Sequence, residues 1–196
     1  MTEIPPESNA LAESDDELMY RVASGDDRAF RQLVERHQTL VIGTIARMIG
    51  TADAEDLGQQ VFLNVWKSAP RWRPEAKVTT WLLTIAKRLV FNESRRRGRT
   101  RLIPQSQQAD REVPDPPDPA IGPDRQLLEG ELHLAIESAL ASLPEKERLA
   151  VVLRRYEEMP YEEIAEVLSV SLPAVKSLLF RARNSLRDKL SPYLGE

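Results

Sequence analysis

Hydrophobic positions recur along the first half of this chain at the spacing of α-helices. Leu18 and Val22 lie four residues apart, and residues 24–27 predict the end of one helix and the cap of the next. The stripes that follow consist of Phe30, Leu33 and Val34; Val41, Ile45, Met48 and Ile49; Leu57, Val61 and Val65; and Trp81, Ile85 and Leu89. No alternating run is long enough for a β-sheet, so this half is predicted to be helical.

The composition changes between residues 104 and 123, where six prolines and four acidic residues fall among twenty positions. Proline interrupts helices, and this stretch has little apolar surface to bury. We interpret it as a semi-extended acidic linker, for which a spacer role is a sufficient explanation.

Helical spacing returns after the linker in four short stripes. They consist of Leu132, Ala135, Ile136, Ala139 and Leu140; Leu149, Val152, Leu153 and Tyr156; Ile164, Ala165 and Leu168; and Val175, Leu179, Ala182 and Leu186. The last two stripes are joined by the short segment 169–171. A short helix, a tight turn and a basic helix are typical of a helix-turn-helix.

These patterns predict an all-α protein with two small helical domains joined by a Pro-rich acidic linker. We expect a disordered acidic N-terminus over residues 1–14 and a first helical domain over 15–103. The linker is expected over 104–124, and the domain with the helix-turn-helix over 125–196.

Charge is distributed unevenly along the chain. The net charge of −4 argues against nonspecific nucleic-acid binding by the molecule as a whole. Residues 87–101, however, hold seven basic residues and one acidic residue, and residues 171–190 hold five basic residues and one acidic residue. Two basic islands in an acidic background are where contacts with phosphate are expected.

Composition also argues against several classes of function. Without cysteine the chain has no disulfide, no thiol catalyst and no cysteine-based zinc site. Its two histidines, His37 and His133, belong to no metal-ligand cluster and to no nucleophile–base pair, so we expect no catalytic residue, metal or cofactor. The chain shows no signal segment and no run of about eighteen apolar residues. We therefore expect a cytoplasmic protein without membrane insertion.

The helix that carries the second basic island has the composition of a DNA-reading helix. Ser171 is its predicted N-cap, and Pro173 lies in the first turn, where a missing N–H costs little. With the stripe that begins at Val175 facing the core, the outward or flanking residues are Ala174, Lys176, Ser177, Phe180, Arg181 and Asn184. Small residues allow close approach to base edges, and cations bind phosphate or guanine. An ordinary amphipathic helix with a solvated basic face is the alternative interpretation.

The first basic island has aromatic residues beside it. Trp72 and Trp81 bracket Lys77, Thr79 and Thr80, and the helix from Trp81 continues into three arginines at 95–97. Flat rings beside hydrogen-bond donors suit unstacked, single-stranded bases. A place in the core is the alternative for both rings, and it is the stronger interpretation for Trp81, which belongs to an apolar stripe.

The segment 53–66 has features of a contact surface for a protein. Acidic residues in its first turn favour the helix dipole, which is a sufficient structural reason for them. Phe62 and Trp66 lie four residues apart, beside the stripe of Leu57 rather than on it. We expect this second apolar edge to be partly exposed and to bind a partner.

Together these segments resemble a bacterial RNA polymerase sigma factor of the extracytoplasmic-function group, which keeps only sigma regions 2 and 4. Residues 53–66 are similar to its core-polymerase-binding helix. The run from Trp72 through 80–86 to 95–97 resembles its promoter-melting and minus-ten-reading segment. Residues 143–148, 161–165 and 175–183 resemble region 4. The resemblance covers roughly residues 15–103 and 125–191, and several motifs in order are more specific than any single one.

The resemblance implies a protein that binds core RNA polymerase and promoter DNA and is a monomer when free. An anti-sigma factor is a further partner that the family allows. The implied polymerase contacts are Asp53, Glu55, Asp56, Gln59, Gln60, Phe62 and Trp66. The implied minus-ten contacts are Trp72, Lys77, Thr79, Thr80, Arg88, Asn92, Arg95, Arg96 and Arg97. The implied minus-thirty-five contacts are Ser171, Ala174, Lys176, Ser177, Phe180, Arg181 and Arg183.

The sequence departs from the family pattern at five positions. Gln60 occupies a position that is usually Glu, Arg88 one that is usually Asn, and Asn92 one that is commonly Asp. Pro173 replaces a frequent Gly, and Leu178 a frequent Arg. We expect the polymerase contact and both promoter contacts to differ in detail from those of the family.

A stand-alone helix-turn-helix regulator is the alternative. It would need a dimer interface or a ligand pocket, it would not need the N-terminal domain, and it would bind operator DNA without polymerase. As a sigma factor, the free chain is instead expected to bind promoter duplex weakly. Acidic segments flank both basic islands, and a flexible linker does not hold the two domains at promoter spacing.

Overall fold

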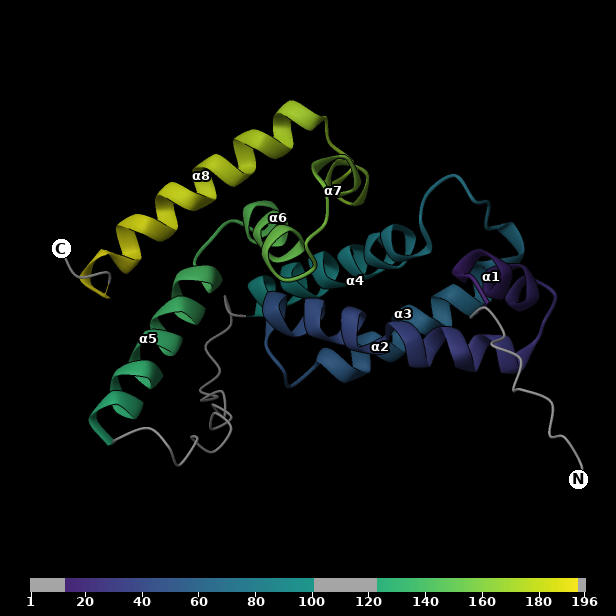
Figure 1. Cartoon of the computed structure of the whole chain (residues 1–196), viewed down its shortest axis with the longest axis horizontal. Helices are drawn as coiled ribbons and strands as arrows, with labels where there is room; N and C mark the ends of the chain where they lie inside the picture. Colours follow the sequence, from purple (N-terminus) through teal and green to yellow (C-terminus); the bar gives the residue numbers. More distant parts are fainter. Residues whose placement is uncertain (1–12, 101–122, 194–196) are drawn as a thin grey trace, which may run out of the picture.

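A computed structural model describes residues 13–100 and 123–193 of the chain, and all of its regular elements there are helices (Figure 1). The N-terminal helices are α1 (Asp15–Ala23), α2 (Asp27–Ile49), α3 (Ala54–Ser68) and α4 (Val78–Thr100), with the 3-10 turn η1 (Ala69–Arg71) after α3. The C-terminal helices are α5 (Pro123–Ala141), α6 (Glu145–Arg155), α7 (Tyr161–Leu168) and α8 (Leu172–Leu190), followed by the 3-10 turn η2 (Ser191–Tyr193). The predicted all-α class is confirmed. Residues 1–12 and 104–122, on which the expected disordered N-terminus and linker fall, lie outside the described residues.

The first two helices begin where local side chains satisfy their free N–H groups. Ser14 and Glu17 form a reciprocal capping box at the start of α1, so the two last residues of the expected disordered segment are ordered. Asp26 accepts hydrogen bonds from the backbone of Arg28 and Ala29 at the start of α2, as the segment 24–27 predicts.

Two other helix starts lack a side-chain cap. Ser171, the predicted N-cap, precedes α8, and Asp53 precedes α3, yet neither side chain makes the capping hydrogen bond. Asp53 instead pairs with Arg97, near the end of α4. The carboxylate therefore joins two helices rather than capping one.

The N-terminal helices form a bundle in which α3 packs between α2 and α4. Gly58 permits the close approach of α3 to α2, because a Cβ at this position would lie 2.7 Å from Cγ1 of Ile42. His37 is buried beneath α1, with Nε2 2.9 Å from Oδ2 of Asp15. This histidine therefore lies inside the bundle.

The C-terminal helices contain the predicted helix-turn-helix in α7 and α8. The turn between them places Ser169 in the left-handed region, with φ of 56°. Helix α6 packs on both α7 and α8, and α5 packs along α8. Leu140, Leu143 and Ala182 form a small second core between α5, α6 and α8.

The two groups of helices pack against one another, with α6 and α7 lying between α8 and the N-terminal bundle (Figure 1). Helix α7 contacts α4 and helix α6 contacts α2, so a single hydrophobic cluster extends across both groups. Polar contacts add to it: Arg148 donates to the carbonyl of Met48 at 2.7 Å, and Lys87 donates to the carbonyl of Val167 and to Oγ of Ser169. The two predicted helical domains are therefore present, and in this structure they contact one another.

One ionisable group makes this packing dependent on pH. Glu157, just after α6, accepts a hydrogen bond from Oγ1 of Thr44 at 3.3 Å and lies 3.9 Å from Nη1 of Arg47. Burial raises the pKa of the Glu157 carboxyl above its ordinary value, although Arg47 and Thr44 oppose the shift. Packing therefore favours the protonated acid and is weakened when the group ionises.

Glu157→Gln is expected to raise the melting temperature at pH 7 to 8, because the neutral amide retains an acceptor for Thr44 and avoids the burial of a charge. A group with a raised pKa destabilises the folded form above that pKa, and the penalty disappears as the pH falls towards about 4.3. The difference in melting temperature between the variant and the wild-type chain should shrink accordingly. Thermal unfolding followed by circular dichroism across this pH range measures it, with the exposed Glu158→Gln as control. A variant less stable than wild type at pH 7 would contradict the prediction.

Candidate nucleic-acid interface

The loop before α4 forms an open depression of about 310 Å³ lined by Arg71, Trp72, Arg73, Glu75, Ala76 and Trp81. The ring of Trp72 is 6% exposed and packs edge-on against Tyr20, with ring centroids 5.5 Å apart. This burial favours the core alternative for Trp72. The face of Trp72 that was expected to stack on a base is thus not exposed to solvent. The half-buried Trp81 lines the depression together with the guanidinium groups of Arg71 and Arg73. Arg71 and Arg73 were missed because they fall outside the basic island.

The expected minus-ten residues at the start of α4 are engaged by α7. Lys77 pairs with Glu163 through Nζ and Oε1 at 2.6 Å. Thr80 is buried and donates to Glu163 Oε2 at 3.5 Å. Thr79 between them is half-buried. In this arrangement the residues predicted to hold single-stranded DNA are partly covered by the helix-turn-helix.

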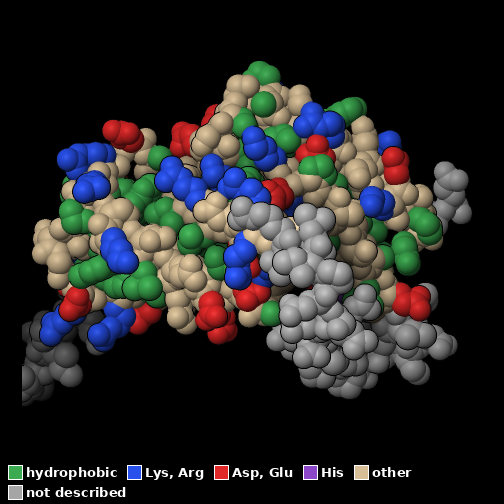
Figure 2. All heavy atoms as spheres, turned by 180° about the vertical axis from the view of Figure 1, so that it is seen from behind, with side chains coloured by type: hydrophobic (Ala, Val, Ile, Leu, Met, Phe, Trp, Pro, Cys, Tyr) green, Lys and Arg blue, Asp and Glu red, His purple; other side chains and the backbone are tan. Residues whose placement is uncertain are grey.

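The second half of α4 presents basic side chains along one helix. Arg88 and Arg95 are exposed, and Arg95 donates to the side-chain oxygen of Asn92. Arg96 is exposed but paired with Glu93. Figure 2 shows Lys and Arg side chains gathered in a band across the middle of one face of the molecule. Such a band suits a nucleic-acid backbone.

Arg97 differs from the other arginines of α4. Its guanidinium donates to the carbonyl of Ile49 at 2.9 Å and pairs with Glu93 and Asp53. These contacts join the ends of α2 and α4 to the start of α3. Arg97 was expected to contact the minus-ten element and Asp53 to contact polymerase. In this structure the two side chains pair with one another within the bundle.

The outer face of α8 carries most of the expected minus-thirty-five residues. Lys176, Ser177, Arg183 and Phe180 are exposed, and the Phe180 ring is the most exposed large apolar group described. The other expected positions are Ala174, which is half-buried, and the exposed Ser171 and Arg181. Leu178, which departs from the family pattern, is buried with Val175, Leu179 and Ala182. It therefore belongs to the core of the C-terminal helices rather than to the reading face.

The outer face of α3 is polar with one apolar group. Glu55, Asp56, Gln59 and Gln60 are exposed, as expected of contact residues. The expected exposure of Phe62 is wrong, because its side chain is only 6% exposed. Trp66 is half-buried and packs on Phe30, with ring centroids 5.0 Å apart. Leu63, at 55% exposed, is the apolar group that α3 presents, and it was missed because it lies off both apolar edges.

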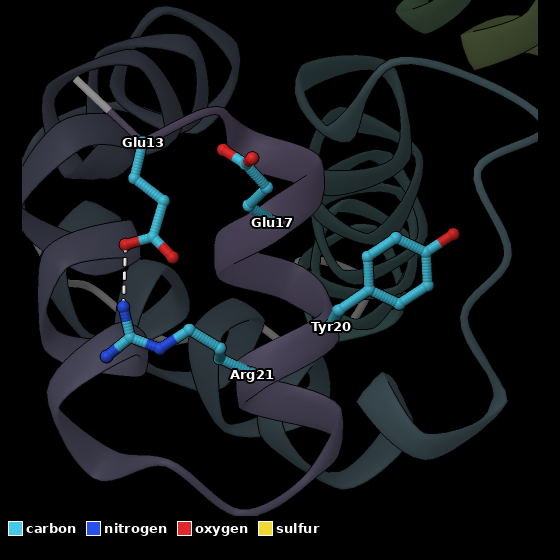
Figure 3. Close-up of a pocket in the computed structure, with 4 residues that line it drawn as sticks. All are labelled: Glu13, Glu17, Tyr20 and Arg21. Atoms are coloured by element: carbon cyan, nitrogen blue, oxygen red, sulfur yellow. Dashed lines mark hydrogen bonds and ion pairs between the residues drawn. The ribbon is translucent and has the colours of Figure 1, made fainter. Parts of the chain in front are cut away.

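A second depression, of about 460 Å³, lies beside α1 and is lined by Glu13, Glu17, Tyr20 and Arg21 (Figure 3). Its charges are already paired: Arg21 binds Glu13 at 2.6 Å, and Glu17 accepts from Ser14. Within residues 13–100 and 123–193, no three His, Asp or Glu side chains are placed to hold a metal ion. No helix in the described part of the chain is long and apolar enough to cross a membrane.

Comparison with known proteins assigns both halves of the chain. The family described as Sigma-70 region 2 matches residues 33–100, and the family described as Sigma-70, region 4 matches residues 133–186. The RNA polymerase sigma-H factor of Pseudomonas aeruginosa is 33% identical over 189 residues, covering 94% of this chain and 97% of the relative. The ECF RNA polymerase sigma-E factor of Escherichia coli K12 is 30% identical over 187 residues, covering 92% of this chain and 96% of that protein.

Solved structures agree with this assignment. CnrH, in complex with the cytosolic domain of CnrY, superposes with a TM-score of 0.64 at 27% identity, covering 92% of this chain and 99% of that chain. A sigma factor from Bartonella quintana, crystallised with the anti-sigma factor NepR, superposes with a TM-score of 0.63 at 22% identity, covering 83% of this chain and 96% of that chain. The second likeness supports the fold.

Proposed function

Since the chain belongs to the RNA polymerase sigma factors of the extracytoplasmic-function group, we propose that it binds core polymerase through α3 and places two DNA-reading surfaces on a promoter. Region 2 corresponds to residues 15–103 and region 4 to residues 125–196, with the linker over 104–124 between them. In this role the chain performs no covalent chemistry and acts in the cytoplasm with the polymerase.

The observation that carries the proposal is the match to regions 2 and 4 in order along one chain. A stand-alone regulator would need only the helix-turn-helix, whereas residues 33–100 match the sigma region of the N-terminal helices. The exposed basic face of α8 supports reading of the minus-thirty-five duplex. The depression beside Arg71, Arg73 and Trp81 supports capture of an unpaired minus-ten base.

The partners follow from the relatives. RNA polymerase is named for the sigma factors of P. aeruginosa and E. coli, and the solved structures of CnrH and the B. quintana protein contain CnrY and NepR. Core polymerase, promoter DNA and an anti-sigma factor are the corresponding partners proposed for this chain, which is a monomer when free. Run-off transcription by core enzyme with and without the purified chain tests the proposal. A promoter-bearing template transcribed equally in both cases would contradict it.

Leu63→Glu is expected to weaken binding to core polymerase at least about tenfold, because it puts a charge where an apolar side chain would be buried by the partner. The substitution should not affect folding, since Leu63 is exposed in the free chain. Co-elution with core enzyme at graded concentrations measures the affinity. Leu134→Glu on α5 is the matched control, because Leu134 is similarly exposed and lies in another helix. Equal affinities for the two variants would exclude this part of α3 from the contact.

A further inference from the structure

The first turn of α6 holds a carboxylate against the reading face of α8. Glu147 is the third residue of α6 and is only 8% exposed, although it is charged. Its Oε1 accepts a hydrogen bond from Nε of Arg181 at 2.7 Å. The side chain of Arg181 remains 57% exposed beyond this contact. A buried acid thus holds one end of an exposed guanidinium.

Both partners are suited to a fixed geometry. A carboxylate in the first turn of a helix is favoured by the free backbone N–H groups and the helix dipole, and burial limits the rotamers of Glu147. A guanidinium is planar and carries five N–H donors. When Nε is held by Glu147, the orientation of the planar group is restricted while 57% of the Arg181 side chain remains exposed. Among the described residues, Glu147 forms the ion pair with the Arg181 guanidinium.

We infer that Glu147 is a positioning residue that sets the base preference of Arg181 in the minus-thirty-five element. This inference rests on the proposed function and deepens it, because it names how one base-reading group is oriented. A pre-oriented guanidinium matches the two acceptors of a guanine edge without losing its rotamer freedom on binding. Glu147 itself stays below the reading face and does not contact DNA.

The electrostatics give this role a recognisable signature. A carboxylate near DNA repels phosphate, so it weakens binding to every sequence by a similar amount. A fixed orientation of Arg181, in contrast, strengthens binding only to DNA that has the matching base at the position Arg181 reads. Loss of the carboxylate is therefore expected to lower discrimination at one base pair while binding to nonspecific DNA is kept or increased. A loss of folding would instead lower both quantities.

The test uses the chain bound to core polymerase and a set of promoters in which each minus-thirty-five base pair is replaced in turn. The Arg181→Ala variant identifies the base pair that Arg181 reads, because replacing that base pair no longer changes promoter use by this variant. Glu147→Met, which keeps the length of the side chain but removes the acceptor, should lower discrimination at that base pair at least about fivefold. Discrimination at the other positions should change less than about twofold. Glu147→Gln keeps an acceptor for Nε and should restore most of the preference.

Glu145→Met is the matched control, since Glu145 is a second acid in the first turn of α6 and the described residues show no hydrogen bond or ion pair between it and Arg181. Three outcomes in the Glu147 variants would overturn the inference: unchanged discrimination in Glu147→Met, an equal loss at every position, or Glu147→Gln no better than Glu147→Met. A fourth is an Arg181→Ala variant that alters no position, which would leave the sigma function intact. Failure of the wild-type chain to start transcription with core enzyme would contradict the proposed function itself.

Discussion

Trp72→Ala is expected to lower the free energy of unfolding by about 3–5 kcal/mol, the typical cost of removing a large aromatic side chain from a core. Trp72 is buried beside η1, where it packs edge-on against Tyr20 of α1. The loss should appear as a lower midpoint in urea denaturation with little change in its slope. Trp72→Phe keeps an aromatic group against Tyr20 and is expected to lose less.

The same experiment separates the two interpretations of this ring. Trp81→Ala is the comparison variant, because Trp81 is half-buried and lies on the rim of the depression with Arg71 and Arg73. It should cost less stability than Trp72→Ala but should reduce open-complex formation, measured by permanganate reactivity of promoter thymines. A Trp72→Ala chain as stable as wild type that forms no open complex would instead establish Trp72 as a base-stacking residue.

Glu163→Arg is expected to raise the affinity of the free chain for single-stranded minus-ten DNA at least about tenfold, or about 1.4 kcal/mol. Glu163 on α7 pairs with Lys77 and accepts from Thr80, both of which are expected minus-ten contacts. Replacing it with a cation removes the pair and repels Lys77, so α7 should separate from α4 and uncover that surface. Fluorescence anisotropy with a labelled oligonucleotide, without polymerase, measures the change.

Glu162→Arg provides the matched control for this variant. Glu162 is the exposed neighbour on the same turn of α7, so its replacement adds the same charge without touching Lys77. Equal affinities for the two variants would mean that added charge, and not opening of the α4–α7 contact, causes the gain. The weak promoter binding expected of the free chain stays a prediction. In this structure α7 pairs with the exposed Lys77 through Glu163, covers Thr80, and binds Lys87 through the carbonyl of Val167.

The helices and their order were predictable from the sequence because helical periodicity is a local property. A side chain every three or four residues faces the same side, so the stripe at Leu57, Val61 and Val65 locates α3 without knowledge of its neighbours. The cap at Asp26 depends on backbone within three residues and was equally accessible. Which face of α8 is exposed could be predicted for the same reason.

Only the tertiary structure decided which of the apolar side chains outside these stripes are buried or exposed. It also decided which charged side chains form ion pairs. Phe62 is buried because α3 packs between two helices, and this leaves Leu63 as the exposed group. The pairs Arg97–Asp53 and Arg181–Glu147 join different helices, so their formation depends on how those helices cross and on the rotamers that packing permits. The packing of α7 on α4 likewise joins distant segments, and it is favoured by buried area and hydrogen bonds that exist only after the helices assemble.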